Sequence, residues 1–132
     1  MGFENEFKKL PNKEQADLLE KRFLQVFREQ KLKSENNIRL YAELVKQRLE
    51  KYKDEIAQQK KVRYEKGLPE MLMWLKDENE KIEREFDTIV KQIARTEHPL
   101  LKEKNMKNTE IMLEIKLKLV ENKFKNWLQE FE

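Results

Sequence analysis

Apolar residues recur along much of this chain at alternating steps of three and four, the spacing that places them on one narrow face of a helix. Two runs keep this spacing longest. The first run contains Ile38, Ala42, Val45, Leu49, Tyr52 and Ile56. The second run contains Leu68, Leu72, Leu75, Asn79, Ile82, Phe86, Ile89 and Ile93. Gly67 and Pro69 lie between the runs and can end one helix and start the next, so the pattern predicts an antiparallel helical hairpin.

Two shorter helices are expected to pack against this hairpin. Asn12 can cap the first helix, and Ser34 has the side chain of a new N-cap, so the first helix should end just before it. Pro99 disfavours helix at the residue before it. The expected helices therefore cover residues 12–33, 34–66, 69–98 and about 108–132. We expect an all-α fold, an antiparallel bundle of four helices in which the second and third form a long coiled-coil-like hairpin.

The last helix is ambiguous from its pattern. Between Leu113 and Leu119 apolar and polar residues alternate strictly, which is typical of a strand. No other segment of the sequence offers a strand to pair with, and an isolated strand would leave its backbone groups unpaired. The spacing of Leu113, Leu117, Val120 and Phe124 also fits a helix, and we therefore predict one.

This helix has a second apolar face, formed by Ile111, Met112, Ile115 and Leu119. A helix that lies between two neighbours buries a broad apolar stripe, and this is the favoured interpretation. The alternative is that the face forms the seam of a homodimer.

Composition limits the function classes. The 132 residues suffice for one domain, residues 1–132, in which residues 1–11 form an N-terminal arm or lid. There is no cysteine, so disulfides and thiolate metal sites are excluded. The longest apolar run is Met71–Leu75, far below the roughly 20 residues of a membrane span. No signal peptide is recognisable, so we expect a cytoplasmic protein that has no membrane partner.

Nothing in the sequence predicts an enzyme, a cofactor or a metal site. The only histidine, His98, stands at an expected helix end and lacks a carboxylate three residues before it, where Arg95 stands. Two glycines cannot build a phosphate-binding loop. The acidic residues of the third expected helix lie off its apolar face, as solvated residues do.

Aromatic residues and methionine favour a protein partner, because such residues often anchor interfaces. In the expected topology one end of the bundle gathers Phe3, Phe7, Met73, Trp74, Trp127 and Phe131. These side chains either plug the end of the bundle, which we favour, or leave part of it open to bind a partner. The function we expect is a non-enzymatic protein-protein interaction module of the adaptor, chaperone or inhibitor type.

A basic ridge supports an alternative function, as a nucleic-acid-binding subunit of a ribonucleoprotein complex. Its residues are Lys53, Lys60, Lys61, Arg63 and Lys66. Such a row of cations can follow a phosphate backbone. Acidic residues are interleaved over most of the chain, however, so a solvated helix surface is the favoured interpretation.

Overall fold

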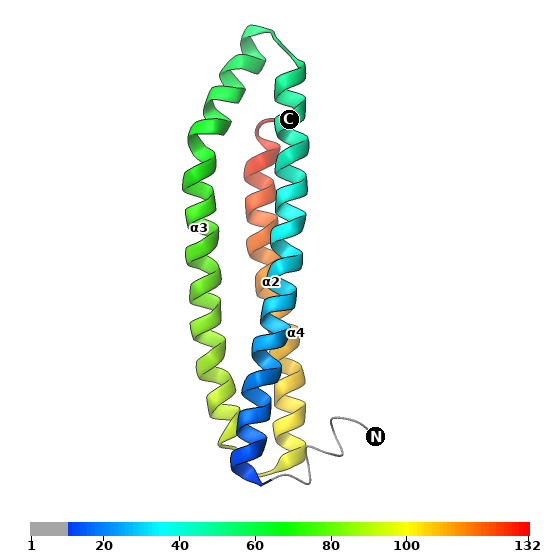
Figure 1. Cartoon of the computed structure of the whole chain (residues 1–132), viewed down its shortest axis with the longest axis vertical. Coiled ribbons are helices and arrows are strands. Elements are labelled where there is room, and N and C mark those ends of the chain that lie inside the picture. The colour runs from blue at the N-terminus through cyan, green and yellow to red at the C-terminus, as the bar shows by residue number, and fades with distance from the viewer. Residues whose placement is uncertain (1–10) are drawn as a thin grey trace. The chain divides into compact units, whose positions relative to one another are not determined.

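The computed structural model describes residues 11–132, and these residues form three helices and no strand (Figure 1). The helices are α2 (Asn12–Lys51), α3 (Glu55–Ala94) and α4 (Pro99–Gln129). The all-α prediction is therefore confirmed, whereas the prediction of a four-helix bundle is wrong. The expected N-terminal arm, apart from Pro11, lies outside the described residues.

Ser34, at which the sequence predicts the start of a new helix, lies inside α2. The chain contains no glycine or proline between residues 12 and 66, so nothing in the backbone forces a break there. Helix α2 continues through Ser34, which is half-buried inside it. The expected boundary at residues 33 and 34 is thus wrong: α2 covers the first expected helix and residues 34–51 of the second, whose residues 55–66 belong to α3.

The chain reverses at residues 52–54, between α2 and α3, and not at Gly67 and Pro69 as the sequence predicts. Asp54 caps α3, because its Oδ1 accepts the backbone N–H of Ala57 at 2.7 Å. Both Gly67 and Pro69 lie inside α3.

The link between α3 and α4 is shorter than the sequence predicts. Helix α3 ends at Ala94 and α4 already begins at Pro99, nine residues before the expected start at Asn108. His98 stands at the start of α4, where its Nδ1 accepts the backbone N–H of Leu101 at 3.4 Å. Residues 113–119 lie within α4, so their expected helical conformation is confirmed.

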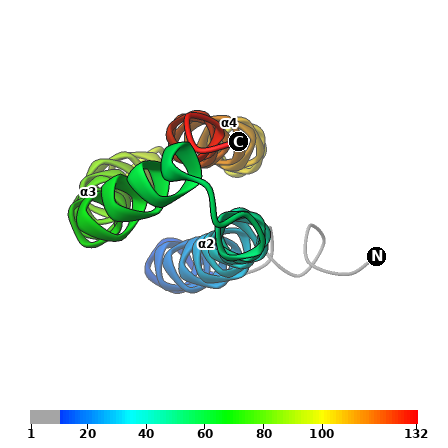
Figure 2. The same ribbon diagram turned by 90° about the horizontal axis from the view of Figure 1, so that it is seen from above.

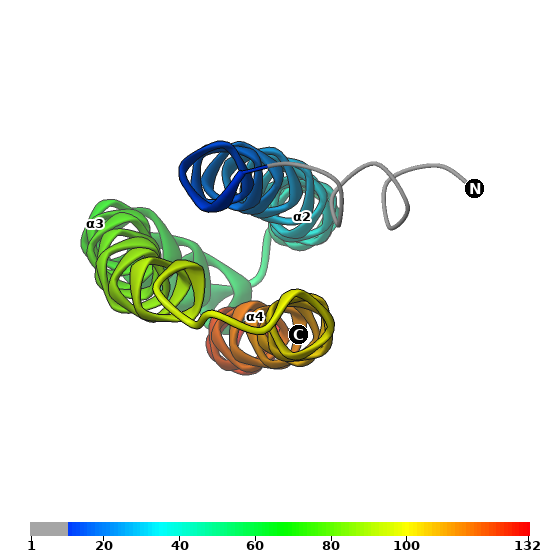
Figure 3. The same ribbon diagram turned by 90° about the horizontal axis from the view of Figure 1, so that it is seen from below.

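The described chain divides into two compact units, each made of three helical segments. Among the described residues, the first unit combines residues 11–30 with Lys81–Lys116. Figure 3 shows its three segments, the start of α2, the end of α3 and the start of α4. Phe23 of α2 and Phe86 of α3 stack inside it, with ring centroids 6.3 Å apart. Its other buried apolar residues include Leu19, Phe27, Ile82, Val90, Ile93, Met106 and Leu113.

The second unit combines Lys31–Glu80 with Leu117–Glu132. Figure 2 shows its three segments from above, the end of α2, the start of α3 and the end of α4. Within it α2 and α3 are antiparallel neighbours joined by residues 52–54. The core of this unit is formed by Ile38, Val45, Leu49, Tyr64, Leu75, Phe124, Leu128 and Phe131.

A polar cluster joins α2 to α4 inside the second unit. The carboxylate of Glu121 is buried and accepts hydrogen bonds from Asn37 at 3.2 Å, Lys118 at 2.7 Å and Lys125 at 3.1 Å. Burial opposes ionisation of this carboxyl group, but the three hydrogen bonds outweigh it, so the pKa of Glu121 lies below its ordinary value. The cluster therefore keeps a charged carboxylate inside the unit.

Candidate functional site

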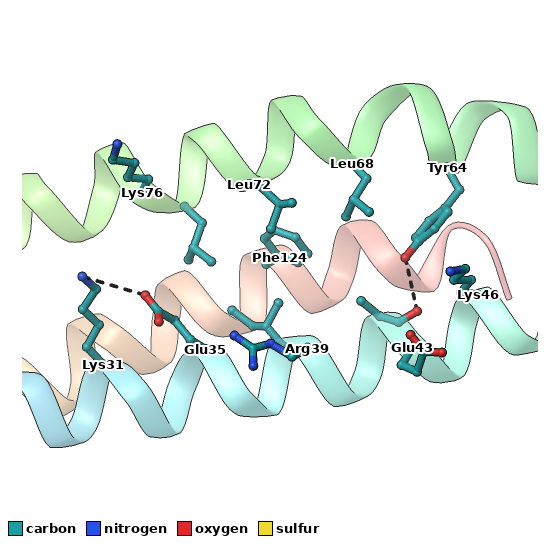
Figure 4. A pocket seen from close by; sticks show the side chains of 13 residues that line it. Lys31, Glu35, Arg39, Glu43, Lys46, Tyr64, Leu68, Leu72, Lys76 and Phe124 are labelled. Atoms are coloured by element: carbon teal, nitrogen blue, oxygen red, sulfur yellow. Dashed lines mark hydrogen bonds and ion pairs between the residues drawn. The ribbon is translucent and has the colours of Figure 1, made fainter.

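An open groove runs along the second unit between α2 and α3, above Phe124 of α4 (Figure 4). Its volume is about 540 Å³. Helix α2 contributes Lys31, Glu35, Ile38, Arg39, Ala42, Glu43 and Lys46, and helix α3 contributes Tyr64, Leu68, Leu72, Leu75 and Lys76. The groove is lined by thirteen residues from all three helices, five of which are isoleucine, leucine or phenylalanine, and we take it as the candidate site.

The floor of the groove is apolar and continuous with the core. Ile38, Leu75 and Phe124 are buried core residues that also line it. Leu68 is half-buried, and the side chain of Leu72 is 49% exposed. Figure 4 shows Leu68 and Leu72 on the side of α3 that faces α2. An apolar ligand could therefore reach leucine side chains that water now contacts.

Tyr64 supplies a polar group to this apolar floor. Its hydroxyl donates a hydrogen bond to the backbone carbonyl of Ala42 at 3.2 Å, across the groove from α3 to α2. Burial and, to a smaller degree, the charge of Glu43 raise the pKa of Tyr64 above its ordinary value. The hydroxyl therefore stays protonated at neutral pH and keeps this link between the helices.

Charged residues form the rim of the groove. Lys31 and Glu35 pair with each other on α2, at 3.9 Å. Arg39 and Lys46 follow on the same helix, and Lys76 lies on α3. The combination of an apolar floor and a charged rim can bind an elongated amphipathic ligand.

The structure describes four of the six residues of the predicted aromatic site, and Trp74 and Trp127 pack against the core cluster that contains Phe131. Phe3 and Phe7 lie outside the described residues. Trp127 and Phe131 pack on each other with ring centroids 5.0 Å apart, and Trp127 also stacks on Tyr64 at 6.1 Å. Phe131 belongs to the core of the second unit. Trp127 and Phe131 thus both pack on Tyr64, a residue that lines the groove.

Met73 and Trp74 lie in the middle of α3, not at its start as expected. Met73 is 67% exposed. Trp74 is half-buried, and Lys123 lies over its ring, with Nζ 5.3 Å from the ring centroid. The expected end of a bundle, at which these residues would meet Phe131, depended on a helix start at Pro69 that the structure does not have.

The predicted basic ridge also changes with the new helix boundaries. Lys53 belongs to the link between α2 and α3, whereas the other four cations lie on α3. Lys60 Nζ donates a hydrogen bond to the backbone carbonyl of Glu132 at 3.1 Å. Arg63 and Lys66 are exposed, and Lys61 is half-buried. Arg63 lines a shallow depression together with Glu55, Gln58, Gln59 and Val62. An acidic residue, Glu55, therefore lies beside Arg63 of the basic ridge.

The second apolar face of α4 is exposed in the structure. Its residues Ile111, Met112, Ile115 and Leu119 are all more than half exposed. The interpretation that two neighbouring helices bury this face is therefore wrong for the described residues. The homodimer seam stays a prediction.

The described residues show no group of three or more acidic, histidine or cysteine side chains that could hold a metal ion. Within residues 11–132, no helix contains the extended stretch of apolar residues that a membrane span requires.

Sequence patterns missed the groove because Leu68 and Leu72 belong to the same apolar run as the buried Leu75. The rim residues Arg39, Lys46 and Lys76 gave no signal, because single cations on a helix surface are common. The groove's apolar floor and charged rim are thus the observations from which a function can be argued.

Comparisons of the chain with protein-family models, with curated proteins and with solved structures find no match.

Proposed function

We propose that this protein is a non-enzymatic interaction protein that binds an amphipathic helix of a partner protein in the groove between α2 and α3. The observation that carries the proposal is the apolar floor at Leu68 and Leu72, which is accessible between the charged rim of α2 and Lys76 of α3. In this mode of recognition, apolar side chains spaced three and four residues apart on the partner helix enter such a groove.

The length of the groove suits a helix. On α2 its lining extends from Lys31 to Lys46, which corresponds to about 22 Å at about 1.5 Å per residue. On α3 the lining extends from Tyr64 to Lys76, or about 18 Å. A partner helix of about four turns would fill this length and place three or four apolar side chains on the floor. Charged residues recur at each turn of the α2 rim, where they can follow the polar edge of such a helix.

The central contact of this proposal is Leu72. It is the most exposed apolar residue of the floor, so it has the most surface to bury against a partner. Residues at the centre of an interface that become fully desolvated contribute most to affinity, and their truncation commonly costs more than about 1 kcal/mol. A charged side chain at this position would lose its hydration when the apolar partner helix binds. A charged substitution should therefore weaken binding more than truncation of Leu72 does.

Peptide binding tests the proposal. A labelled helical peptide of about 20 residues, with a leucine stripe and uncharged glutamine flanks, is titrated with the protein, and fluorescence anisotropy is measured. We expect Leu72→Asp to weaken binding at least about tenfold. Leu40→Asp is the matched control, because Leu40 is an exposed leucine of α2 that does not line the groove. It should leave the affinity unchanged.

Circular dichroism and thermal unfolding of both variants establish that they fold as the wild type does. Methyl-resolved NMR then identifies the leucines that the peptide contacts, with shifts expected at Leu68 and Leu72. No binding by the wild-type protein, or equal weakening by Leu72→Asp and Leu40→Asp, would show that the groove is not the binding surface.

A further inference from the structure

The rim of the groove restricts the chemistry of its occupant beyond an apolar stripe. We infer that the occupant is an acidic amphipathic helix, one that carries carboxylates on both flanks of its apolar stripe. This inference rests on the proposed function, because it names the partner of the same groove. The argument is charge complementarity between the rim and the helix.

Cations outnumber anions on the rim. Four cations line the groove, Lys31, Arg39, Lys46 and Lys76, against the two carboxylates of Glu35 and Glu43. Glu35 already pairs with Lys31. Among the described residues Arg39, Lys46 and Lys76 form no ion pair. The rim therefore has three cations to offer a ligand and only the Glu43 carboxylate to oppose them.

These three cations stand on both sides of the groove. Arg39 and Lys46 are on α2, seven residues or about 10 Å apart along the helix, which is two turns. Lys76 is on α3, on the opposite side (Figure 4). In Figure 4 the Lys76 side chain extends away from α2, but it is exposed and can turn toward a helix bound between α2 and α3, which would then meet cations on each edge. Acidic residues two turns apart on one flank and another on the other flank would match this arrangement.

The expected effect of this match is moderate, because the rim is exposed to solvent. Ion pairs between exposed side chains contribute little each, and salt screens them. Two or three such pairs should together tighten binding about three- to thirtyfold. They should also accelerate association at low ionic strength. A carboxylate-flanked peptide should therefore lose more affinity with added salt than an uncharged one.

Three peptides that share one leucine stripe test the inference on the full chain. Their flanking positions carry glutamate, glutamine or lysine, and their affinities are measured at low and high salt. We expect the glutamate peptide to bind most tightly and the lysine peptide most weakly. The double variant Arg39→Glu, Lys76→Glu should reverse this order. The control double variant Lys33→Glu, Lys66→Glu changes the net charge equally at exposed positions of α2 and α3 outside the groove lining, and should keep the order.

The outcomes separate this inference from the proposed function. Equal binding of the three peptides would overturn the acidic occupant and leave helix binding intact. Reversal of the order by both double variants would also overturn it, because net charge instead of the rim would then decide. Binding of none of the peptides would remove the proposed function itself. A molecular mass that rises with concentration in the wild type and not in Leu72→Asp would place a second copy of the chain in the groove, and would overturn the inference as well.

Discussion

Gly67 of α3 lies against the indole ring of Trp127 on α4, so closely that a Cβ atom at position 67 would stand 2.8 Å from Cζ2 of the ring. The ring has little room to move away. It stacks on Tyr64 and packs edge-on against Phe124 and Phe131. Glycine is therefore required here by the close approach of two helices, and not by the end of a helix.

This contact predicts that Gly67→Ala destabilises the protein. In a solvent-exposed helix the same change would stabilise by about 1 kcal/mol, because alanine favours the helix over glycine. Overpacking against a fixed aromatic ring costs typically about 1–3 kcal/mol and should outweigh that gain. Urea unfolding should therefore give a lower free energy of unfolding for the variant than for the wild type.

The matched control is the same substitution in a Trp127→Leu background. Leucine lacks the ring that a new Cβ would meet, so Gly67→Ala should there raise the free energy of unfolding by up to about 1 kcal/mol. A stabilising effect in both backgrounds would show that the two residues do not touch as described.

Pro69 provides a second prediction, because it lies inside α3 and is exposed. A proline within a helix lacks the N–H that bonds to the carbonyl of residue 65, and its ring crowds that carbonyl. Pro69→Ala should therefore raise the free energy of unfolding by about 1–3 kcal/mol. Pro99→Ala is the control, since Pro99 is the first residue of α4, where proline is well tolerated. A loss of stability in Pro69→Ala would favour a chain reversal at this position.

The seam positions could be predicted from the sequence. Of the expected apolar runs, Ile38, Val45, Leu49, Leu75 and Ile82 are buried in the structure. Tyr52 and Ile56, the last two residues of the first run, are exposed, because the chain reverses between α2 and α3. Spacing of three and four is a local property of a helix and does not depend on where that helix ends. This explains why the buried face was identified although the helix boundaries were wrong.

The position of the reversal could have been found from a local signal. Asp54 followed by Glu55 has the N-cap and the acidic first turn that start a helix. Gly67 and Pro69 form a stronger turn signal than Asp54 and Glu55, but the chain does not reverse there. The reason for Gly67 is a contact with Trp127, sixty residues further along the chain, which no local pattern contains.

The groove could not have been predicted from periodicity. Leu72 and Leu75 share one apolar face of α3, yet Leu72 is half exposed and Leu75 is buried. The difference depends on how α2, α3 and Phe124 are spaced within the second unit. A hydrophobic pattern identifies the residues of a face, but it does not give the distance between the helices that share it.

Glu121 provides a prediction about pH. Its pKa is lower in the folded protein than its ordinary value of 4.5, so its charged form stabilises the fold. This contribution is complete above pH 4.5 and is lost as the pH falls through the lower pKa of the folded state. Glu121→Gln should therefore reduce the free energy of unfolding at pH 7 by about 1–3 kcal/mol.

The difference between wild type and Glu121→Gln should shrink below pH 4.5, measured by urea unfolding at several pH values. Glu114→Gln is the control, because Glu114 is an exposed carboxylate of the same helix. Its effect should stay within about 0.5 kcal/mol at every pH. A difference for Glu121→Gln that does not depend on pH would mean that the carboxylate is not held in its charged form.

The alternating segment of α4 yields the last prediction. In a strand, residues 113, 115 and 117 would share one face, and their truncation would have similar effects. In the helix, Leu113 is 0% exposed and Leu117 is buried, whereas Ile115 is 55% exposed. Leu113→Ala and Leu117→Ala should therefore each cost about 2–5 kcal/mol, and Ile115→Ala less than about 0.5 kcal/mol. Urea unfolding of the three variants measures these values. A large cost for Ile115→Ala would mean that this face of α4 is covered, either by a second copy of the chain or by a different packing of the helix.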